Sequence, residues 1–199
     1  MTMKTLSVLF VLFSLSANAQ VLGELKGQGQ INASYANFDG SSTKRSSPCN
    51  VAMNIHADAK SVAVEFSVFE CSKLTSWNDW PVAYSIVGDK LVDANGVQKG
   101  SVLADGSYQF TEVLESSQTY MDYHYDFDCR MSYIGKKTLT LQNKITYNLK
   151  EINGSWILHR TASEDRQAWK SRRDYDRCPA VTIPTKLGSS TDLTVTLSK

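Results

Sequence analysis

The sequence predicts an all-β fold: an antiparallel meander that closes into a barrel, with a two-sheet β-sandwich as the alternative. Three observations lead to this prediction. Apolar and polar residues alternate over most of the chain, turn sequences of the Asn-Gly and Asp-Gly kind separate the alternating segments, and no βαβ pattern occurs. Consecutive hairpins favour the barrel over the sandwich.

The clearest hairpin spans residues 49–71, two alternating strands joined by a tight turn at Ala59 and Lys60. Pairing Asp58 with Ser61 places apolar residues opposite one another, as a hairpin with one buried face requires. The apolar pairs in this register are Val51 with Val68, Met53 with Phe66, Ile55 with Val64 and Ala57 with Val62. The register leaves Cys49 one residue short of Cys71, so a disulfide between them needs a bulge or a frayed strand end.

The N-terminus has the features of a secretory signal peptide in residues 1–19. Lys4 precedes an apolar segment, 6–15, which is too short to span a bilayer, and Ala17-Asn18-Ala19 matches an A-x-A cleavage site. We therefore expect an exported bacterial protein, periplasmic or extracellular, with one β domain over residues 20–199. No later segment has the composition of a membrane span.

The four cysteines all lie in the part expected to be exported. An even number of cysteines in an oxidising compartment predicts two disulfides, for which three connectivities exist. We favour Cys49–Cys71 and Cys129–Cys178. A metal site is the alternative, but the chain has no C-x-x-C or clustered Cys/His spacing, so we expect no metal and no cofactor.

The other strands follow the same alternation. Leu25, Gly27, Gly29, Ile31 and Ala33 share one face of residues 23–35, and glycines on a buried face are typical of places where a sheet bends or closes. Further strands are expected near 82–87, 90–93, 97–104, 107–114, 122–133, 137–151 and 187–199, with polar loops at 37–48 and 72–81.

The turn Asn153-Gly154 predicts a two-residue type I′ connection. It places Leu149 opposite Leu158 and Tyr147 opposite Arg160. A barrel built from such hairpins resembles the lipocalin-like barrels in architecture. Lipocalins carry Gly-x-Trp on the first strand, whereas the corresponding residues here are Gly23-Glu24-Leu25, so the resemblance extends to architecture alone.

The strand expected at 122–133 is aromatic on one face, which includes Tyr123, Tyr125 and Phe127, and charged on the other. His124, Asp126 and Asp128 form a row on the charged face that could bind a divalent metal. Three ligands on one flat strand rarely converge on an ion, so we interpret the row as a solvated face.

Arg160 is predicted to point inward beside Tyr147, and a buried charge is costly without a partner. We expect either an ion pair with Glu151 or Glu164 or contact with an acidic ligand inside the barrel. Trp77 and Trp80, in the loop that follows the first hairpin, either plug one end of the core or stand at a binding mouth.

Charge and motifs argue against two function classes. The formal charge is +1 at pH 7 and falls to zero without Lys4, so net charge indicates neither nucleic acid nor an anionic membrane as a partner. The charged run 163–177 contains five basic residues, but acids interrupt it; we interpret it as a solvated loop or a short helix near 163–173. No catalytic motif is present, and His56, His124 and His159 are predicted to point outward, so we expect no enzyme.

Two functional hypotheses remain. The first is an exported binding protein that holds a small apolar or acidic ligand in a barrel cavity. Its predicted lining is Tyr123, Tyr125, Phe127, Tyr147 and Arg160, with Trp77 and Trp80 at one end. A filled core would argue against it. The second is a solid-core envelope or secreted protein of the inhibitor or adhesin type, which binds another protein through the loop 77–80 or 168–177.

Overall fold

The computed structural model describes residues 20–21, 23–71 and 81–199, and every regular element among them is a β-strand. The predicted signal peptide and the tryptophans Trp77 and Trp80 lie outside these residues. The strands are β1 (Gln20–Val21), β2 (Leu25–Ala36), β3 (Ser42–Ala57), β4 (Ser61–Cys71), β5 (Val82–Val87), β6 (Lys90–Val92), β7 (Gln98–Val102), β8 (Tyr108–Tyr125), β9 (Met131–Ile152), β10 (Ser155–Arg172) and β11 (Val181–Leu197).

The strands form one antiparallel sheet that closes on itself. From β4 to β11 each strand pairs with the next along the chain, β11 then pairs with β2 and β2 with β3, and the β3–β4 pairing completes a barrel-like ring. The short β1 adds to the end of β3. The all-β antiparallel prediction is confirmed, and we call the closed part of the sheet the ring.

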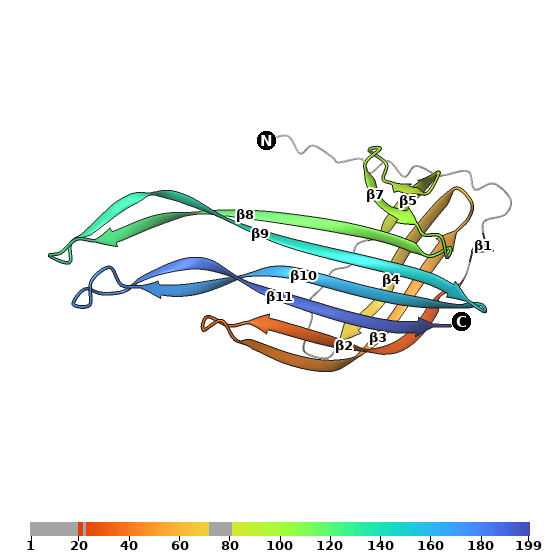
Figure 1. Ribbon diagram of the computed structural model, residues 1–199, viewed down its shortest axis with the longest axis horizontal. Helices are drawn as coiled ribbons and strands as arrows, with labels where there is room; N and C mark the ends of the chain where they lie inside the picture. The colour runs from red at the N-terminus through yellow and green to blue at the C-terminus, as the bar shows by residue number, and fades with distance from the viewer. Residues whose placement is uncertain (1–19, 22, 72–80) are drawn as a thin grey trace, which may run out of the picture.

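Four strands are far longer than the ring requires, because β8 to β11 contain 17 to 22 residues each. The β9–β10 pairing ends where Asn143 faces Glu164. Beyond that point the chain continues as two hairpins, β8–β9 and β10–β11, which run side by side away from the ring (Figure 1). We call these segments, residues 113–142 and 165–188, the arm.

The interior of the ring is filled by side chains. Phe66 on β4 and Tyr147 on β9 lie on opposite walls, yet their ring centroids are 5.9 Å apart. The Arg160 guanidinium of β10 lies 5.1 Å from the centroid of Phe69 on β4. Leucine, isoleucine and methionine side chains with no more than 1% exposure pack around these contacts. Side chains of opposite walls therefore touch in the described part of the ring, which argues against the ligand cavity of the first hypothesis.

The glycines Gly27 and Gly29 on β2 do not leave empty space inside the ring. A Cβ atom on Gly27 would lie 2.2 Å from the Thr196 carbonyl oxygen, and one on Gly29 would lie 2.5 Å from that of Thr194. The two glycines allow β2 and β11 to approach closely. The space that their missing side chains leave is occupied by the neighbouring strand.

The hairpin over residues 49–71 has the predicted turn and the predicted bulge. Met53 faces Phe66, and the Asp58 amide donates to the Ser61 carbonyl at 2.9 Å. A register shift between Ala52 and Met53 then brings Cys49 directly opposite Cys71, and the two are joined. As a result, Val51 faces Phe69 instead of Val68.

Three local predictions are wrong. Residues 42–48 continue β3 because they pair with β2, whereas a loop was expected up to Pro48. The segment 163–172 forms neither a helix nor a loop; it extends β10, paired with β11 throughout. The strand expected at 122–133 is interrupted by a turn after Tyr125. In the first two segments, cross-strand pairing overrides the local preference of polar and charged residues.

The hairpin between β9 and β10 follows the prediction. Asn153 and Gly154 have φ angles of 53° and 81°, as a type I′ turn requires. Leu149 faces Leu158 and Tyr147 faces Arg160. This turn therefore sets the register of the two longest strands in the ring wall.

Candidate interaction surface at the tip of the arm

The residues predicted to line a cavity lie in two separate places. Tyr147 and Arg160 are buried in the ring. Tyr123, Tyr125 and Phe127 lie at the far end of the arm, where Tyr123 faces Tyr133. Tyr133 and Tyr147 are fourteen residues apart on one strand, β9, which corresponds to roughly 45 Å at about 3.3 Å per residue. The structure therefore does not bring the two groups together.

Arg160 is fully buried, as predicted, and its environment is aromatic. Its guanidinium lies 5.1 Å from the centroid of Phe69 and 5.8 Å from that of Tyr147, within the range of cation–π interaction. Glu164 lies four residues further along the same face of β10. Burial raises the pKa of Glu164, and the charge of Arg160 partly opposes that shift.

The far end of the arm, which we call the tip, comprises residues 120–137 and 168–181. The first of its turns is organised by Asp126, whose carboxylate accepts the backbone amides of Asp128 at 2.9 Å and Arg130 at 2.8 Å. Cys129 adopts a positive φ of 59° in this turn. Because the strand ends before Asp126, the predicted row of His124, Asp126 and Asp128 does not form.

Charged side chains join the two hairpins beneath their turns. The buried Asp122 carboxylate lies 2.6 Å from Lys137 and 3.4 Å from Arg172. Lys137, and then Arg172, hold the pKa of Asp122 below its usual value. Arg172 also donates to the Tyr123 carbonyl and lies 3.1 Å from Asp174. Arg172 of one hairpin is thus surrounded by acceptors from both.

The second connection is covalent, because Cys129 of the first turn is bonded to Cys178 of the second, as predicted. The guanidinium of Arg177 lies 3.6 Å from the centroid of the Phe127 ring and donates to the Phe127 carbonyl. Tyr175 packs edge-on against Phe127, with the ring centroids 5.9 Å apart. The aromatic rings of the two turns are therefore held in one fixed arrangement.

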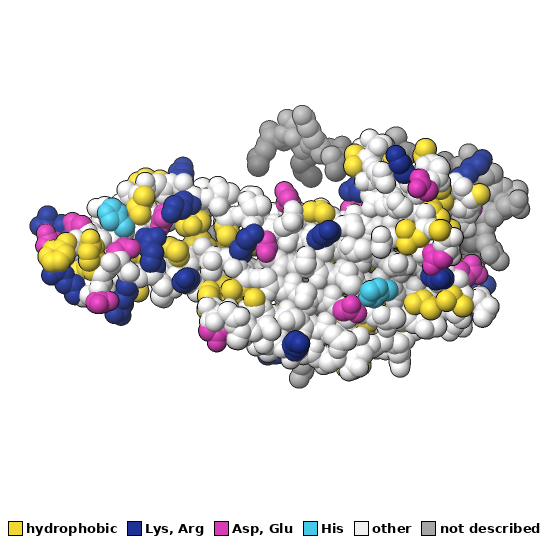
Figure 2. Space-filling view, in the orientation of Figure 1, with side chains coloured by type: hydrophobic (Ala, Val, Ile, Leu, Met, Phe, Trp, Pro, Cys, Tyr) yellow, Lys and Arg dark blue, Asp and Glu magenta, His cyan; other side chains and the backbone are white. Residues whose placement is uncertain are grey.

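This arrangement leaves apolar side chains in solvent. Half of the large exposed hydrophobic side chains in the described residues belong to the tip: Met121, Phe127, Met131, Tyr133, Ile134, Trp169 and Tyr175. Figure 2 shows hydrophobic, basic and acidic side chains gathered at this end, whereas most of the face between the tip and the ring is formed by backbone and by side chains of none of these kinds. Such a concentration of exposed apolar surface is typical of an interaction site.

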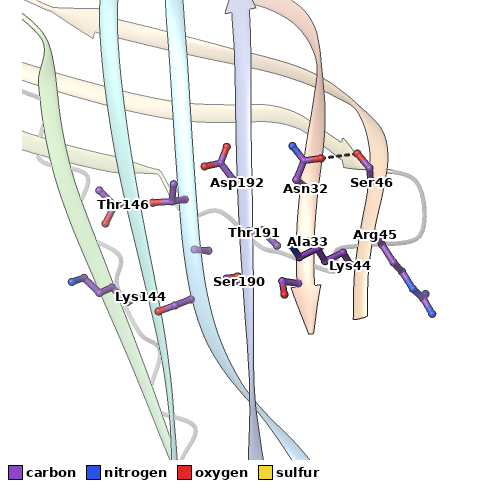
Figure 3. A pocket seen from close by; sticks show the side chains of 14 residues that line it. Asn32, Ala33, Lys44, Arg45, Ser46, Lys144, Thr146, Ser190, Thr191 and Asp192 are labelled. Atoms are coloured by element: carbon purple, nitrogen blue, oxygen red, sulfur yellow. Dashed lines mark hydrogen bonds between the residues drawn. The ribbon is translucent and has the colours of Figure 1, made fainter. Parts of the chain in front are cut away.

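A shallow groove of about 850 Å³ is the second candidate. It crosses the outer face of the sheet where the ring meets the arm, and Ser, Thr and Asn side chains line most of it (Figure 3). Ser46 donates to Asn32 at 2.8 Å, and Asp192 lies 3.2 Å from His159. Its polar side chains are thus partly satisfied by one another, and no large apolar side chain lines it. The tip is the stronger candidate.

Sequence reasoning found parts of the tip but not the tip itself. The aromatic residues of 122–133 and the loop 168–177 were each singled out, on separate grounds. Their proximity follows from the pairing of Cys129 with Cys178, and that predicted disulfide was the signal that could have joined them. The length of the arm had no comparable signal, because the segments 113–119 and 163–172 have no continuous buried face.

Comparison with known proteins gives no further indication of function. No protein-family model matches the sequence, and no curated protein shows significant similarity to it. Among the described residues there is no helix with the length and apolarity needed to cross a membrane. The two disulfides are consistent with an oxidising, exported environment.

Proposed function

We propose that this chain is an exported, non-catalytic binding protein that works through the tip of its arm. The observation that carries the proposal is the cluster formed by Phe127, Tyr175 and Arg177, exposed to solvent and fixed by a disulfide at the far end of the arm. Rigid aromatic side chains lose little conformational entropy on binding, which makes them effective contacts.

The packed ring supports this proposal over the hypothesis of an internal ligand. In our view the ring is a scaffold that anchors four long strands, and the arm carries the contact surface away from it. The second hypothesis predicted that another protein is bound through residues 168–177. These residues form one half of the contact surface.

Retention on the envelope fraction of the host tests the proposal. The labelled protein is compared with two variants, Phe127→Ser/Tyr175→Ser at the tip and Val87→Ser/Val97→Ser on exposed positions of the ring. We expect the tip variant to lose retention and the ring variant to keep it, with melting temperatures close to that of the wild type for both. Equal retention of all three proteins would show that the tip is not the binding surface.

A further inference from the structure

The exposed apolar side chains of the tip lie on both of its hairpins. On the first hairpin, Met131 and Tyr133 occupy one face of β9 and Ile134 is the extra residue of a bulge, and all three are more than half exposed. Trp169, 58% exposed, adds an apolar surface on the second hairpin. A protein partner covers mainly one side of such an element, whereas a lipid headgroup layer surrounds it on all sides. Exposed apolar side chains on both hairpins therefore favour a lipid layer that surrounds the tip over a protein partner that covers one side of it.

The tip carries a net positive charge. The tip contains seven Lys and Arg residues and five Asp residues, so the rest of the exported chain carries a compensating negative charge. Five cations of the tip form no ion pair with any described residue: Arg130, Lys136, Lys170, Arg173 and Arg177. Three acids of the tip, Asp126, Asp128 and Asp176, likewise have no cation partner among the described residues.

The other two acids of the tip form ion pairs inside it. Asp122 contacts Lys137 and Arg172, and Asp174 contacts Arg172 and the Tyr125 amide. Asp126 accepts the amides of its own turn. The unpaired cations of the tip therefore outnumber its unpaired acids by two, so the tip is positive and complements a negatively charged partner.

We propose that the tip inserts shallowly into the headgroup layer of a membrane that contains anionic phospholipid. Aromatic and methionine side chains would enter the boundary between headgroups and acyl chains, while Arg and Lys contact the phosphates. Hairpins suit this position, because strand pairing satisfies most backbone hydrogen-bonding groups within the chain. The inference rests on the proposed function, since it names the partner of the same surface.

Sedimentation with unilamellar vesicles tests the inference on the full exported chain. The vesicles consist of phosphatidylcholine alone or mixed with phosphatidylglycerol. We expect binding to the anionic vesicles, weakened at least tenfold by Met131→Ser/Ile134→Ser and by Arg130→Gln/Lys170→Gln, and unchanged in the ring variant Val87→Ser/Val97→Ser. Raising the salt concentration should weaken the wild type more than the Arg130→Gln/Lys170→Gln variant.

Trp169 reports insertion directly. Its emission should shift to shorter wavelength when anionic vesicles are added, and the Trp169→Phe variant should lose that shift. Absence of binding to anionic vesicles, or binding that the tip variants leave unchanged, would overturn the inference. A different result would point to a protein partner: the wild type does not bind vesicles, and its tip-dependent retention on host envelopes is lost when those envelopes are treated with protease. In that case the inference of a lipid partner is wrong, while the proposed function of the tip still holds.

Discussion

Replacing Gly27 with alanine should destabilise the ring, whereas the same replacement at Gly188 should not. The added Cβ atom at Gly27 would lie 2.2 Å from the Thr196 carbonyl oxygen and 2.6 Å from a methyl carbon of Val195. Ordinary contacts of a Cβ atom begin at 3.4 Å, so β2 and β11 would have to separate by roughly 1 Å. Their pairing is part of the closed ring, which limits how far either strand can move.

The expected cost follows from that geometry. Overpacking of this kind costs about 1–3 kcal/mol of the free energy of unfolding, which for a domain of this size lowers the melting temperature by ~3–10 °C. At Gly188 a Cβ atom would meet nothing within 4 Å. Alanine is favoured over glycine in a strand by roughly 0.5 kcal/mol, so Gly188→Ala should be neutral or slightly stabilising.

Thermal unfolding followed by circular dichroism, with disulfides intact, measures both variants against the wild type. We expect the two variants to change the melting temperature in opposite directions or by clearly different amounts. A Gly27→Ala variant as stable as the Gly188→Ala variant would refute this expectation. That result would mean that β2 and β11 lie further apart than the structure shows.

Two further predictions concern the tip. Because Lys137 and Arg172 lower the pKa of Asp122 in the folded state, its stabilising contribution is complete above the usual Asp pKa and is lost as the pH falls through the depressed value. Urea unfolding from neutral to acidic pH should therefore show the stability gap between wild type and Asp122→Asn closing only below about pH 4; a gap that does not change with pH would contradict this. Replacing Cys129 and Cys178 with serine should cost ~4 kcal/mol by the loop-entropy model for a separation of 49 residues. Hydrogen exchange should then accelerate in the tip while the ring stays protected, and uniform acceleration would show that the arm and the ring unfold as one unit.

Much of the ring could be predicted from the sequence, because its strands have one buried face. Alternation of apolar and polar residues fixes which side of a strand faces the core, and the turn at Asn153-Gly154 fixes the register. The offset of one residue between Cys49 and Cys71 required a bulge or a frayed strand end, and the structure has the bulge, between Ala52 and Met53. Each of these signals is local or joins two adjacent strands.

The arm and its tip depended on the tertiary structure. The segments 113–119 and 163–172 lack a continuous buried face, so their composition does not distinguish a strand from a loop or a short helix. Pairing with a neighbouring strand decides their conformation, and that pairing is propagated from the ring. Tyr123 and Tyr147 have similar sequence environments, yet one lies at the tip and the other in the core. The two tyrosines are far apart because β8 and β9 extend well beyond the ring, and the sequence does not determine where along these strands the ring ends.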